Sequence, residues 1–403
     1  MSTLTTPRPP GPPVTAGPRW QALAWYGVLA AGLAIGLGAF LYQWWAGLHV
    51  TGLTNAVSWG LYIVLFMFLV GVSAGGLIVV AGSELVGSHR LESLNRLAVI
   101  VSGTAIAAAA VSIIPDLGRP ERFWQMLVTP QVMSPLVWDM VIIVVYLTIA
   151  AIDLWILTRP KPQPRALRIM AMITLPVAVL VHSITAFIFG LLVARPFWNT
   201  ALMAPLFISS ALVSGTALIL LVAWLVARFT AFDPPRHVFG DLGKLLAWFI
   251  AVDAFLLGVE VLTVYTSRVP YHTEPLQILL TGELAPLFWA EVSLGLAVPF
   301  VVFAHPRLRA RMPLVLLAAG LAVLGVFAKR VNILFPGLFD PLVGLVPGIP
   351  GGRAGQAFTA SPSYLPTWVE YGVTIGILAF VAALITLGVN RFVVPRQPRT
   401  PRD

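Results

Sequence analysis

Cysteine is absent from this chain of 403 residues, and charged residues are scarce. Without cysteine the protein cannot hold a disulfide, a zinc ion bound by thiolates or an iron–sulfur cluster ligated by its own residues. Aspartate, glutamate, lysine and arginine make up 10% of the residues, against about 25% in an ordinary soluble domain. A soluble fold could not cover its surface with so few charges, which excludes a conventional water-soluble domain.

Hydrophobic residues make up 58% of the chain and gather in long runs. A helical run of about 20 residues crosses the roughly 30 Å of hydrocarbon in a bilayer. Because backbone groups in lipid must be satisfied within the segment, each run is predicted to be a helix. The runs are too long and too uniformly apolar for barrel strands. We therefore predict an all-α integral membrane protein with ten spans, at about 22–47, 56–82, 94–114, 134–157, 168–194, 200–227, 244–267, 280–304, 312–330 and 366–390.

The basic residues predict the orientation of these spans. With the N-terminus in the cytoplasm, 18 lysines and arginines fall on the inner side and 7 on the outer side, as the positive-inside rule requires. We expect both termini in the cytoplasm and the protein in the cell inner membrane. Residues 1–20 and 391–403 are predicted to be cytoplasmic tails, the first of them disordered, and 21–390 the membrane domain with a long outer loop at 331–365. The net charge of +9 lies in these short loops and tails, which excludes a nucleic-acid-binding patch.

Charged side chains at membrane depth are costly, so each predicts a functional or paired site. Asp139 lies near the outer end of the fourth span, and His182 lies near the middle of the fifth. Four more acidic residues fall within or at the start of later spans: Asp253, Glu260, Glu291 and Glu370. Two roles stay open for these four: a proton path, or ion pairs such as one between Glu291 or Glu370 and Lys329 or Arg330, which are placed at the outer end of the ninth span.

The histidines argue against a haem. A membrane cytochrome b needs two histidines per haem on facing helices, and of six histidines only His182 lies well inside a predicted span. We therefore expect neither haem nor a metal site in this protein. A hydrogen-bonding or proton-exchanging role is favoured for His182.

Aromatic and glycine residues near the outer face have two interpretations each. Trp59, Tyr62 and Trp124 fit an aromatic belt at the membrane interface, or the wall of a pocket for an apolar ring. Gly75 belongs to a run of small residues that suits close helix packing, or contact with a flat ligand such as a quinone ring.

The predicted outer loop after the third span carries charge that the positive-inside rule does not explain. It holds Arg119 and Arg122 together with Asp116. Contacts with lipid headgroups or ion pairs within the loop are one explanation. Docking of a partner or a ligand is the other.

Several stretches together resemble one family. They are NAVSWGLYIVLFMFLVGVSAGG at 55–76, DLGRPERFWQMLVTP at 116–130, SPLVWD at 134–139 and HSITAFIFGLLVARPFWNTALMAPLFISSALVSG at 182–215. These stretches resemble the polysulfide reductase NrfD/PsrC family of quinone-interacting membrane subunits. Ten spans resemble the longer branch of that family, with the membrane subunits of alternative complex III and of sulfur-cycle complexes.

The resemblance implies a fold and a set of partners. The implied fold has two four-helix bundles plus two additional helices, with no cofactor bound in the chain. The implied substrate is an exchangeable quinone, menaquinone or ubiquinone, in a pocket near the outer face. A ferredoxin-like iron–sulfur subunit would dock over that pocket, with a molybdopterin-type or multihaem subunit beyond it, and membrane lipid around the helices.

The resemblance also implies site residues. Asp139 and His182 fall where that branch has quinone ligands, and they suit the chemistry, since a quinol releases two protons on oxidation and needs a partner at each oxygen. An acidic residue expected shortly after the histidine is replaced by Phe187 and Ile188. The remaining quinone-binding candidates are Asn55, Trp59, Tyr62, Gly75, Asp116, Arg119, Arg122 and Trp124.

The predicted function is that of a quinone-interacting membrane anchor subunit of a respiratory oxidoreductase complex. It would pass electrons between membrane quinone and the external iron–sulfur subunit. The alternative is a secondary transporter, since ten spans with buried carboxylates fit that class too. A third hypothesis adds proton translocation through Asp253, Glu260 and Glu291.

Overall fold

The computed structural model describes residues 19–160, 163–267, 270–339 and 363–394. Within these ranges every regular element is helical, and ten candidate spans are long and apolar enough to cross a membrane. The predicted all-α fold with ten spans is confirmed, and the protein is a multi-pass integral membrane protein. Most of both predicted tails, and positions 340–362 of the predicted outer loop, lie outside the described residues.

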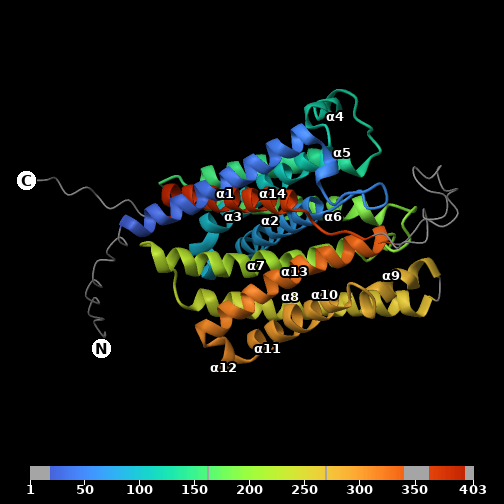
Figure 1. Ribbon diagram of the computed structural model, residues 1–403. Coiled ribbons are helices and arrows are strands. Elements are labelled where there is room, and N and C mark those ends of the chain that lie inside the picture. Colours follow the sequence, from blue (N-terminus) through green and yellow to red (C-terminus); the bar gives the residue numbers. More distant parts are fainter. Residues whose placement is uncertain (1–18, 161–162, 268–269, 340–362, 395–403) are drawn as a thin grey trace, which may run out of the picture.

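The spans follow one another along the sequence as long helices (Figure 1). They are α1 (Arg19–Ala46), α2 (Leu61–Leu85), α3 (Asn95–Ile113), α5 (Pro135–Leu157), α6 (Pro164–Gly190), α7 (Met203–Phe229), α8 (His237–Ser267), the consecutive α10 (Ala285–Ala290), η5 (Glu291–Ala297) and α11 (Val298–Ala304), α13 (Met312–Phe339) and α14 (Trp368–Gly388). The short helices between and after them are η1 (Leu48–Val50), η2 (His89–Leu94), η3 (Ile114–Leu117), η4 (Pro120–Arg122), α4 (Gln125–Val128), α9 (Pro270–Leu280), α12 (Pro306–Arg309) and η6 (Val389–Val393).

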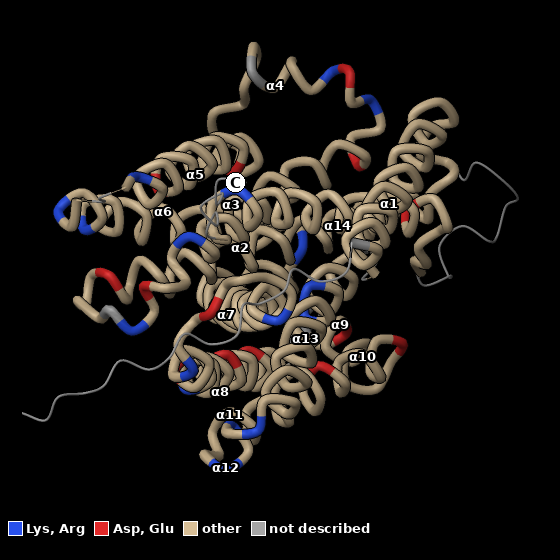
Figure 2. The backbone as a smooth tube through the Cα atoms, turned by 90° about the vertical axis from the view of Figure 1, so that its left-hand side faces the viewer, with Lys and Arg blue, Asp and Glu red and all other residues tan. Residues whose placement is uncertain are grey.

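The spans pack as two four-helix bundles and one helix pair. Helices α2, α3, α5 and α6 form the first bundle, and α7, α8, α13 and the α10–η5–α11 span form the second. The two remaining spans, α1 and α14, pack on each other, and α14 also packs on α3. The view along the helices in Figure 2 shows the three groups, with α1 and α14 to one side.

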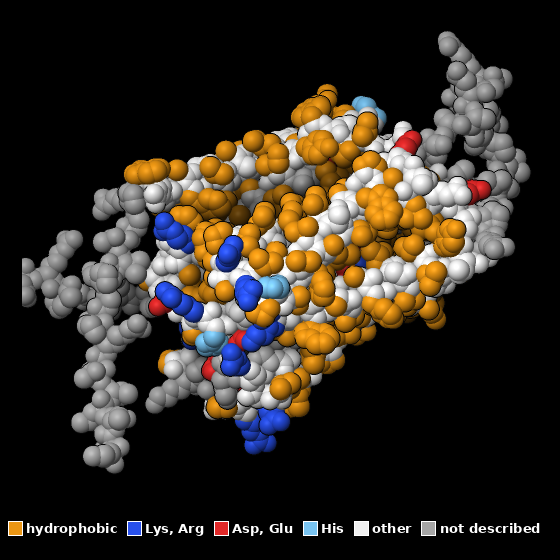
Figure 3. Space-filling view, turned by 90° about the horizontal axis from the view of Figure 1, so that it is seen from below, with side chains coloured by type: hydrophobic (Ala, Val, Ile, Leu, Met, Phe, Trp, Pro, Cys, Tyr) orange, Lys and Arg blue, Asp and Glu red, His pale blue; other side chains and the backbone are white. Residues whose placement is uncertain are grey.

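Exposure follows the position of each helix in this arrangement. In α2, which contacts α3, α6, α7 and α13, 94% of the most apolar stretch is buried, whereas only 17% is buried in α8. Large apolar side chains such as Trp248 and Phe255 of α8 therefore face outward, as lipid-facing residues do. Figure 3 shows apolar side chains over much of the face, with basic side chains gathered at one end.

Glycines set the closest helix contacts. Gly36 of α1 faces Gly376 of α14, and Gly295 of η5 faces Gly325 of α13. Gly215 of α7 meets the backbone of Gly75 and Gly76 in α2, which joins the two bundles. Without side chains at these positions the backbones come into direct contact, as small residues allow in membrane helices.

Two span boundaries differ from the prediction. Helix α13 does not end at Arg330 but continues to Phe339, so the predicted outer loop begins after 339 rather than at 331. The reason is that Lys329 and Arg330 are buried, at 2% and 0% exposure, and face neighbouring helices instead of the membrane surface. The eighth span begins at Ala285 rather than at 280, because residues 270–280 form the separate helix α9.

The Gly36–Gly376 contact gives a testable prediction. A Cβ at Gly36 would lie 2.9 Å from the backbone nitrogen of Gly376, whereas nothing lies within 4 Å of a Cβ at Gly38, two residues along α1. We expect Gly36→Val to destabilise the protein by about 1–3 kcal/mol, the usual scale of overpacking, and Gly38→Val to change it little. Thermal unfolding of the purified variants in detergent measures both. Equal shifts of the melting temperature would contradict the close packing of α1 on α14.

Candidate functional site

A buried ion pair lies in the interior of the second bundle. Lys329 of α13 donates to Oδ1 of Asp253 in α8 at 2.6 Å, and the Ser209 hydroxyl of α7 donates to the same oxygen at 2.6 Å. The side chains of the pair are 3% and 0% exposed. Two charges in a dry interior are tolerated only when they are paired and hydrogen-bonded. These three residues therefore hold α13, α8 and α7 together.

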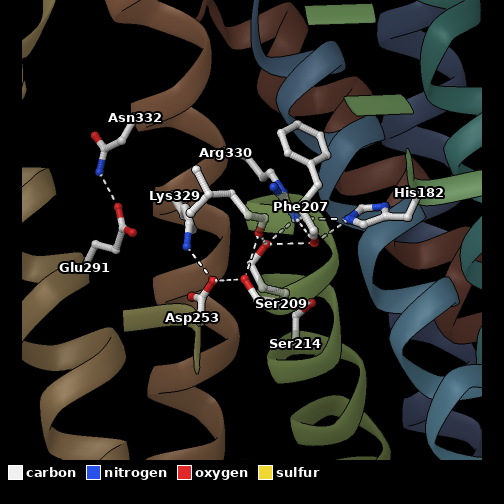
Figure 4. Close-up of polar contacts among 11 residues, drawn as sticks. His182, Phe207, Ser209, Ser214, Asp253, Glu291, Lys329, Arg330 and Asn332 are labelled. Carbon is white, nitrogen blue, oxygen red and sulfur yellow. Dashed lines mark hydrogen bonds and ion pairs between the residues drawn. The ribbon is translucent and has the colours of Figure 1, made fainter. Parts of the chain in front are cut away.

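Arg330, the next residue of α13, points in a different direction (Figure 4). Successive helical residues are about 100° apart, so Arg330 reaches α7 and the first bundle. It donates to Ser210 at 2.8 Å, and its guanidinium carbon lies 4.2 Å from the centre of the Phe207 ring. A Cβ at Gly71 of α2 would lie 3.3 Å from both Arg330 and His182, so this glycine makes room for the two side chains.

The hydrogen bonds of His182 assign its tautomer. Nε2 lies 2.7 Å from the carbonyl oxygen of Phe207. A carbonyl only accepts, so Nε2 carries the proton and Nδ1 presents a lone pair. The Arg330 nitrogen at 3.4 Å from Nε2 is itself a donor, so that contact is a neighbouring charge and not a hydrogen bond. Nδ1 is buried and has no partner within the described part of the chain.

Asp139 lies beside the same helix as His182. Thr185, one turn along α6 from His182, donates to Oδ1 of Asp139 at 2.6 Å. Asp139 and Thr185 are 3% and 0% exposed. Thr185 therefore links the two predicted catalytic residues. It binds Asp139 of α5 and lies one turn from His182 within α6.

The other predicted acidic residues of the second bundle have neutral partners. Asn332 of α13 donates to Glu291 at 2.7 Å, and Thr200 donates to Glu260 at 3.1 Å. Glu291 opens η5, a π-helical turn, and its second oxygen has no partner among the described residues. The predicted pairing of Glu291 with Lys329 is corrected: the acidic partner of Lys329 is Asp253, because both face the α7–α8–α13 interface.

Glu370 joins the start of α14 to the segment between α1 and α2. One carboxylate oxygen accepts from the backbone nitrogens of Gly52 at 2.7 Å and Thr367 at 3.0 Å, and the other accepts from the hydroxyl of Tyr364. Glu370 thus completes a capping box at the start of α14. Burial, together with the hydrogen bond to Glu370, raises the pKa of Tyr364. The predicted pairing of Glu370 with Lys329 or Arg330 is therefore not found.

Two predicted quinone-binding residues lie close to this cap. Tyr62 donates to Gln43 at 2.5 Å, and the amide of Gln43 donates to the carbonyl of Pro115 at 2.7 Å. Asp116 and Glu370 both lie within electrostatic reach of Tyr62. One oxygen of Asp116 is buried without a partner in the described ranges. The C-terminal end of α1, the N-terminal end of α2 and η3 after α3 thus form a second polar group, separate from His182 and Asp139.

The remaining candidates are divided between the interior and the surface. Trp59 stacks on Trp198 with ring centres 5.8 Å apart, and Gly75 packs against the backbone of Ala211 in α7. The backbone of α7 thus fills the space beside Gly75. Four candidates are exposed: Asn55, Arg119, Arg122 and Trp124. The last three belong to the loop around α4, which stands clear of the bundle in Figure 1.

The interior position of Lys329 and Arg330 was not predicted from the sequence. Two adjacent basic residues after an apolar run are typical of a span end, but the residues that follow, Val-Asn-Ile-Leu-Phe, are again mostly apolar. That return to apolar residues was the available signal. The hydroxyl partners Thr185, Ser209 and Ser210 gave none, because serine and threonine are common in membrane helices.

Ten apolar helices around buried, hydrogen-bonded charges define a polytopic membrane protein with a polar interior. A family model described as "Polysulphide reductase, NrfD" matches residues 49–341. This chain belongs to the NrfD family of polysulphide reductase membrane subunits.

Relatives match over most of the sequence. A Halobacterium salinarum protein, provisionally named as a membrane subunit of dimethyl sulfoxide reductase, is 38% identical over 91% of this chain and 90% of its own length. An Archaeoglobus fulgidus protein named "Hdr-like menaquinol oxidoreductase integral membrane subunit" is 28% identical over 91% of each. A Wolinella succinogenes protein, named as one of the chains of polysulfide reductase, is 27% identical over 70% of this chain and 95% of its own length.

The buried ion pair gives a second prediction. Lys329→Ala leaves Asp253 as an unpaired buried charge, which costs about 3–5 kcal/mol. The double variant Lys329→Met/Asp253→Leu removes both charges and should recover most of the lost melting temperature. Lys244→Ala is the matched control, because Lys244 pairs with Asp241 at 3.3 Å but its side chain is 59% exposed, and exposed pairs contribute little. A double-mutant cycle with purely additive effects would contradict a direct interaction.

Proposed function

We propose that this protein is the quinone-reactive membrane subunit of a multi-subunit oxidoreductase. It passes electrons between membrane quinone and an iron–sulfur subunit on the outer face. The names of the relatives support this: one is named as a menaquinol oxidoreductase subunit, and two are named as subunits of dimethyl sulfoxide and polysulfide reductases. A molybdopterin-type or multihaem subunit lies beyond the iron–sulfur subunit, and both termini lie in the cytoplasm.

The observation that carries the proposal is the free acceptor at Nδ1 of His182, one helical turn from Thr185, which binds the carboxyl of Asp139. A quinol has two hydroxyl groups, each of which must donate its proton when the quinol is oxidised. In our proposal Nδ1 of His182 accepts a hydrogen bond from one quinol hydroxyl, and Asp139 accepts one from the other. Because His182 is fully buried and Asp139 is 3% exposed, binding requires a local opening of the bundle at Thr185.

The outer loop provides the docking surface for the partner. Arg119, Arg122, Phe123 and Trp124 are exposed there, and Phe123 and Trp124 are 40% and 57% exposed. Arginine beside exposed aromatic residues is the composition of protein–protein contact sites. An iron–sulfur subunit with an acidic surface would fit this loop and bring its cluster near the outer ends of α2 and α6.

The second bundle provides the route for proton translocation in this proposal. Asp253 and Glu291 are buried in its interior and Glu260 is half-buried. Glu260, Glu291, Lys329 and Asn332 line a small cavity. The free oxygen of Glu291 can accept a proton. Asp253, whose charge is balanced by Lys329, can hold a water molecule of the route at its second oxygen. Glu370 takes no part, because backbone and tyrosine donors occupy both of its oxygens.

The site assignment predicts a loss of activity in two variants. We expect His182→Ala and Asp139→Asn each to lower quinol-linked turnover of the purified complex by about a hundredfold, the scale of losing a general base. Assembly, read from subunit stoichiometry, should not change. His305→Ala and Asp233→Asn are matched controls, since both residues lie in connections at the inner ends of the helices. Wild-type turnover in both site variants would remove the assignment.

Copurification tests the proposed class of protein. Affinity purification of this protein from its native membrane in mild detergent should retain a subunit with the absorption and paramagnetic resonance signals of iron–sulfur clusters. Arg119→Glu/Arg122→Glu should weaken that retention at moderate salt, because the docking charge is reversed. A protein that purifies alone as a stable particle would favour a secondary transporter instead.

A further inference from the structure

One helix of the first bundle carries a buried polar stripe that the proposed quinone site does not use fully. Asp139, Tyr146 and Asp153 of α5 are spaced seven residues apart, which places them on one face of the helix. They are 3%, 0% and 9% exposed, whereas Val144 and Trp155 on the other side of α5 are 60% and 59% exposed. The inward face of a lipid-facing helix is thus polar at both ends and in the middle.

The two acidic residues have the same kind of partner. Thr185 of α6 donates to Asp139 at 2.6 Å, and Thr174 of α6 donates to Asp153 at 2.8 Å. The two carboxyl groups are about 21 Å apart along the helix axis, at 1.5 Å per residue. Neither forms an ion pair within the described part of the chain, in contrast to Asp253. The α5–α6 pair therefore repeats one aspartate–threonine arrangement near each membrane face.

Asp153 lines a cavity at the inner end of the bundle. The cavity, of about 40 Å³, is also lined by Thr174, Asn95 and Glu84. Asn95 begins α3, and Glu84 lies one residue before the end of α2. A site needs only about 10–15 Å³ of such space to hold a water molecule. These four polar side chains, in an otherwise apolar lining, offer hydrogen-bond partners to a water molecule at this end of the bundle.

Hydroxyl groups lie between the two aspartates. Tyr146 donates to the carbonyl of Ser73 at 2.8 Å, and the hydroxyl of Ser73 donates to the carbonyl of Ser102 at 2.7 Å. The hydroxyl of Ser102 is also buried and lies beside that of Tyr146. Hydroxyls at this depth can relay a proton or hold a water molecule about midway between Asp139 and Asp153.

We propose that Asp153 is a proton-exchange site for the inner side, and that it supplies the first bundle with the protons of the quinone reaction. This rests on the proposed function. Reduction of one quinone takes two electrons, which come from the iron–sulfur partner, and two protons. The protons enter through the cavity at Asp153, pass the hydroxyls around Tyr146 and reach the quinone oxygens beside Asp139 and His182. Quinol oxidation reverses each transfer.

The test measures which side supplies the protons. The complex is reconstituted into liposomes with its outer face outward and the pH dye pyranine inside. Reduced benzyl viologen is added outside as the electron donor, and menadione is the quinone. The readout is the number of protons lost from the lumen per quinone reduced, which does not depend on the rate. We expect about two in the wild type, and a fall of at least fivefold in Asp153→Asn.

Two further variants keep the test decisive. Asp153→Glu retains the carboxyl group and should restore the wild-type ratio, so a loss in Asp153→Asn cannot be ascribed to misfolding alone. Asp233→Asn, an exposed aspartate in the inner α7–α8 connection, should leave the ratio unchanged. An unaltered ratio in Asp153→Asn, or a wild type that takes no protons from the lumen while reducing menadione, would overturn the proposal. Loss of menadione reduction in every preparation, wild type included, would instead count against the proposed function.

Discussion

The interior of this protein is governed by the absence of water in the hydrocarbon layer. A charge placed there is costly unless it finds a partner on another helix. Lys329 meets this requirement, whereas Arg330, which faces different neighbours, keeps Nε and Nη1 buried without a partner among the described residues. Lys329 binds Asp253 of α8, and Arg330 reaches Ser210 of α7 and lies against His182 of α6. Polar contacts thus run from α8 of the second bundle, through α13 and α7, to α6 of the first bundle.

Packing and polar contacts depend on each other at this junction. Gly75 and Gly215 bring α2 and α7 into backbone contact, and Gly71, one turn away, leaves the space in which Arg330 and His182 meet. A side chain at Gly71 would push against both groups. The small residues of α2 therefore serve two purposes: they join the bundles, and they admit a charged side chain next to the histidine of the proposed site.

The sequence predicted the fold well because a membrane span has a physical length and a composition that can be counted. Ten spans, their order and the acidic residues within them could all be predicted from the sequence. The partners were not, since Asp253 and Lys329 are 76 residues apart and no periodicity reports which helix faces which. The end of α13 was misplaced for the same reason. A basic pair marks a helix end only if the pair faces water, and that depends on Asp253 and Ser210, which are remote in sequence.

The buried aspartates of the two bundles differ in whether a cation lies beside them. Asp253 has a lysine at 2.6 Å, so its negative charge is compensated and the group is held in place. Asp139 and Asp153 have only threonine hydroxyls, which can donate to a carboxylate but add no charge. Changing the protonation of Asp253 would leave the lysine unpaired, whereas a change at Asp139 or Asp153 leaves no cation behind. The aspartates of the first bundle are therefore better suited to exchange protons with a quinone, and Asp253 is better suited to hold α8 against α13.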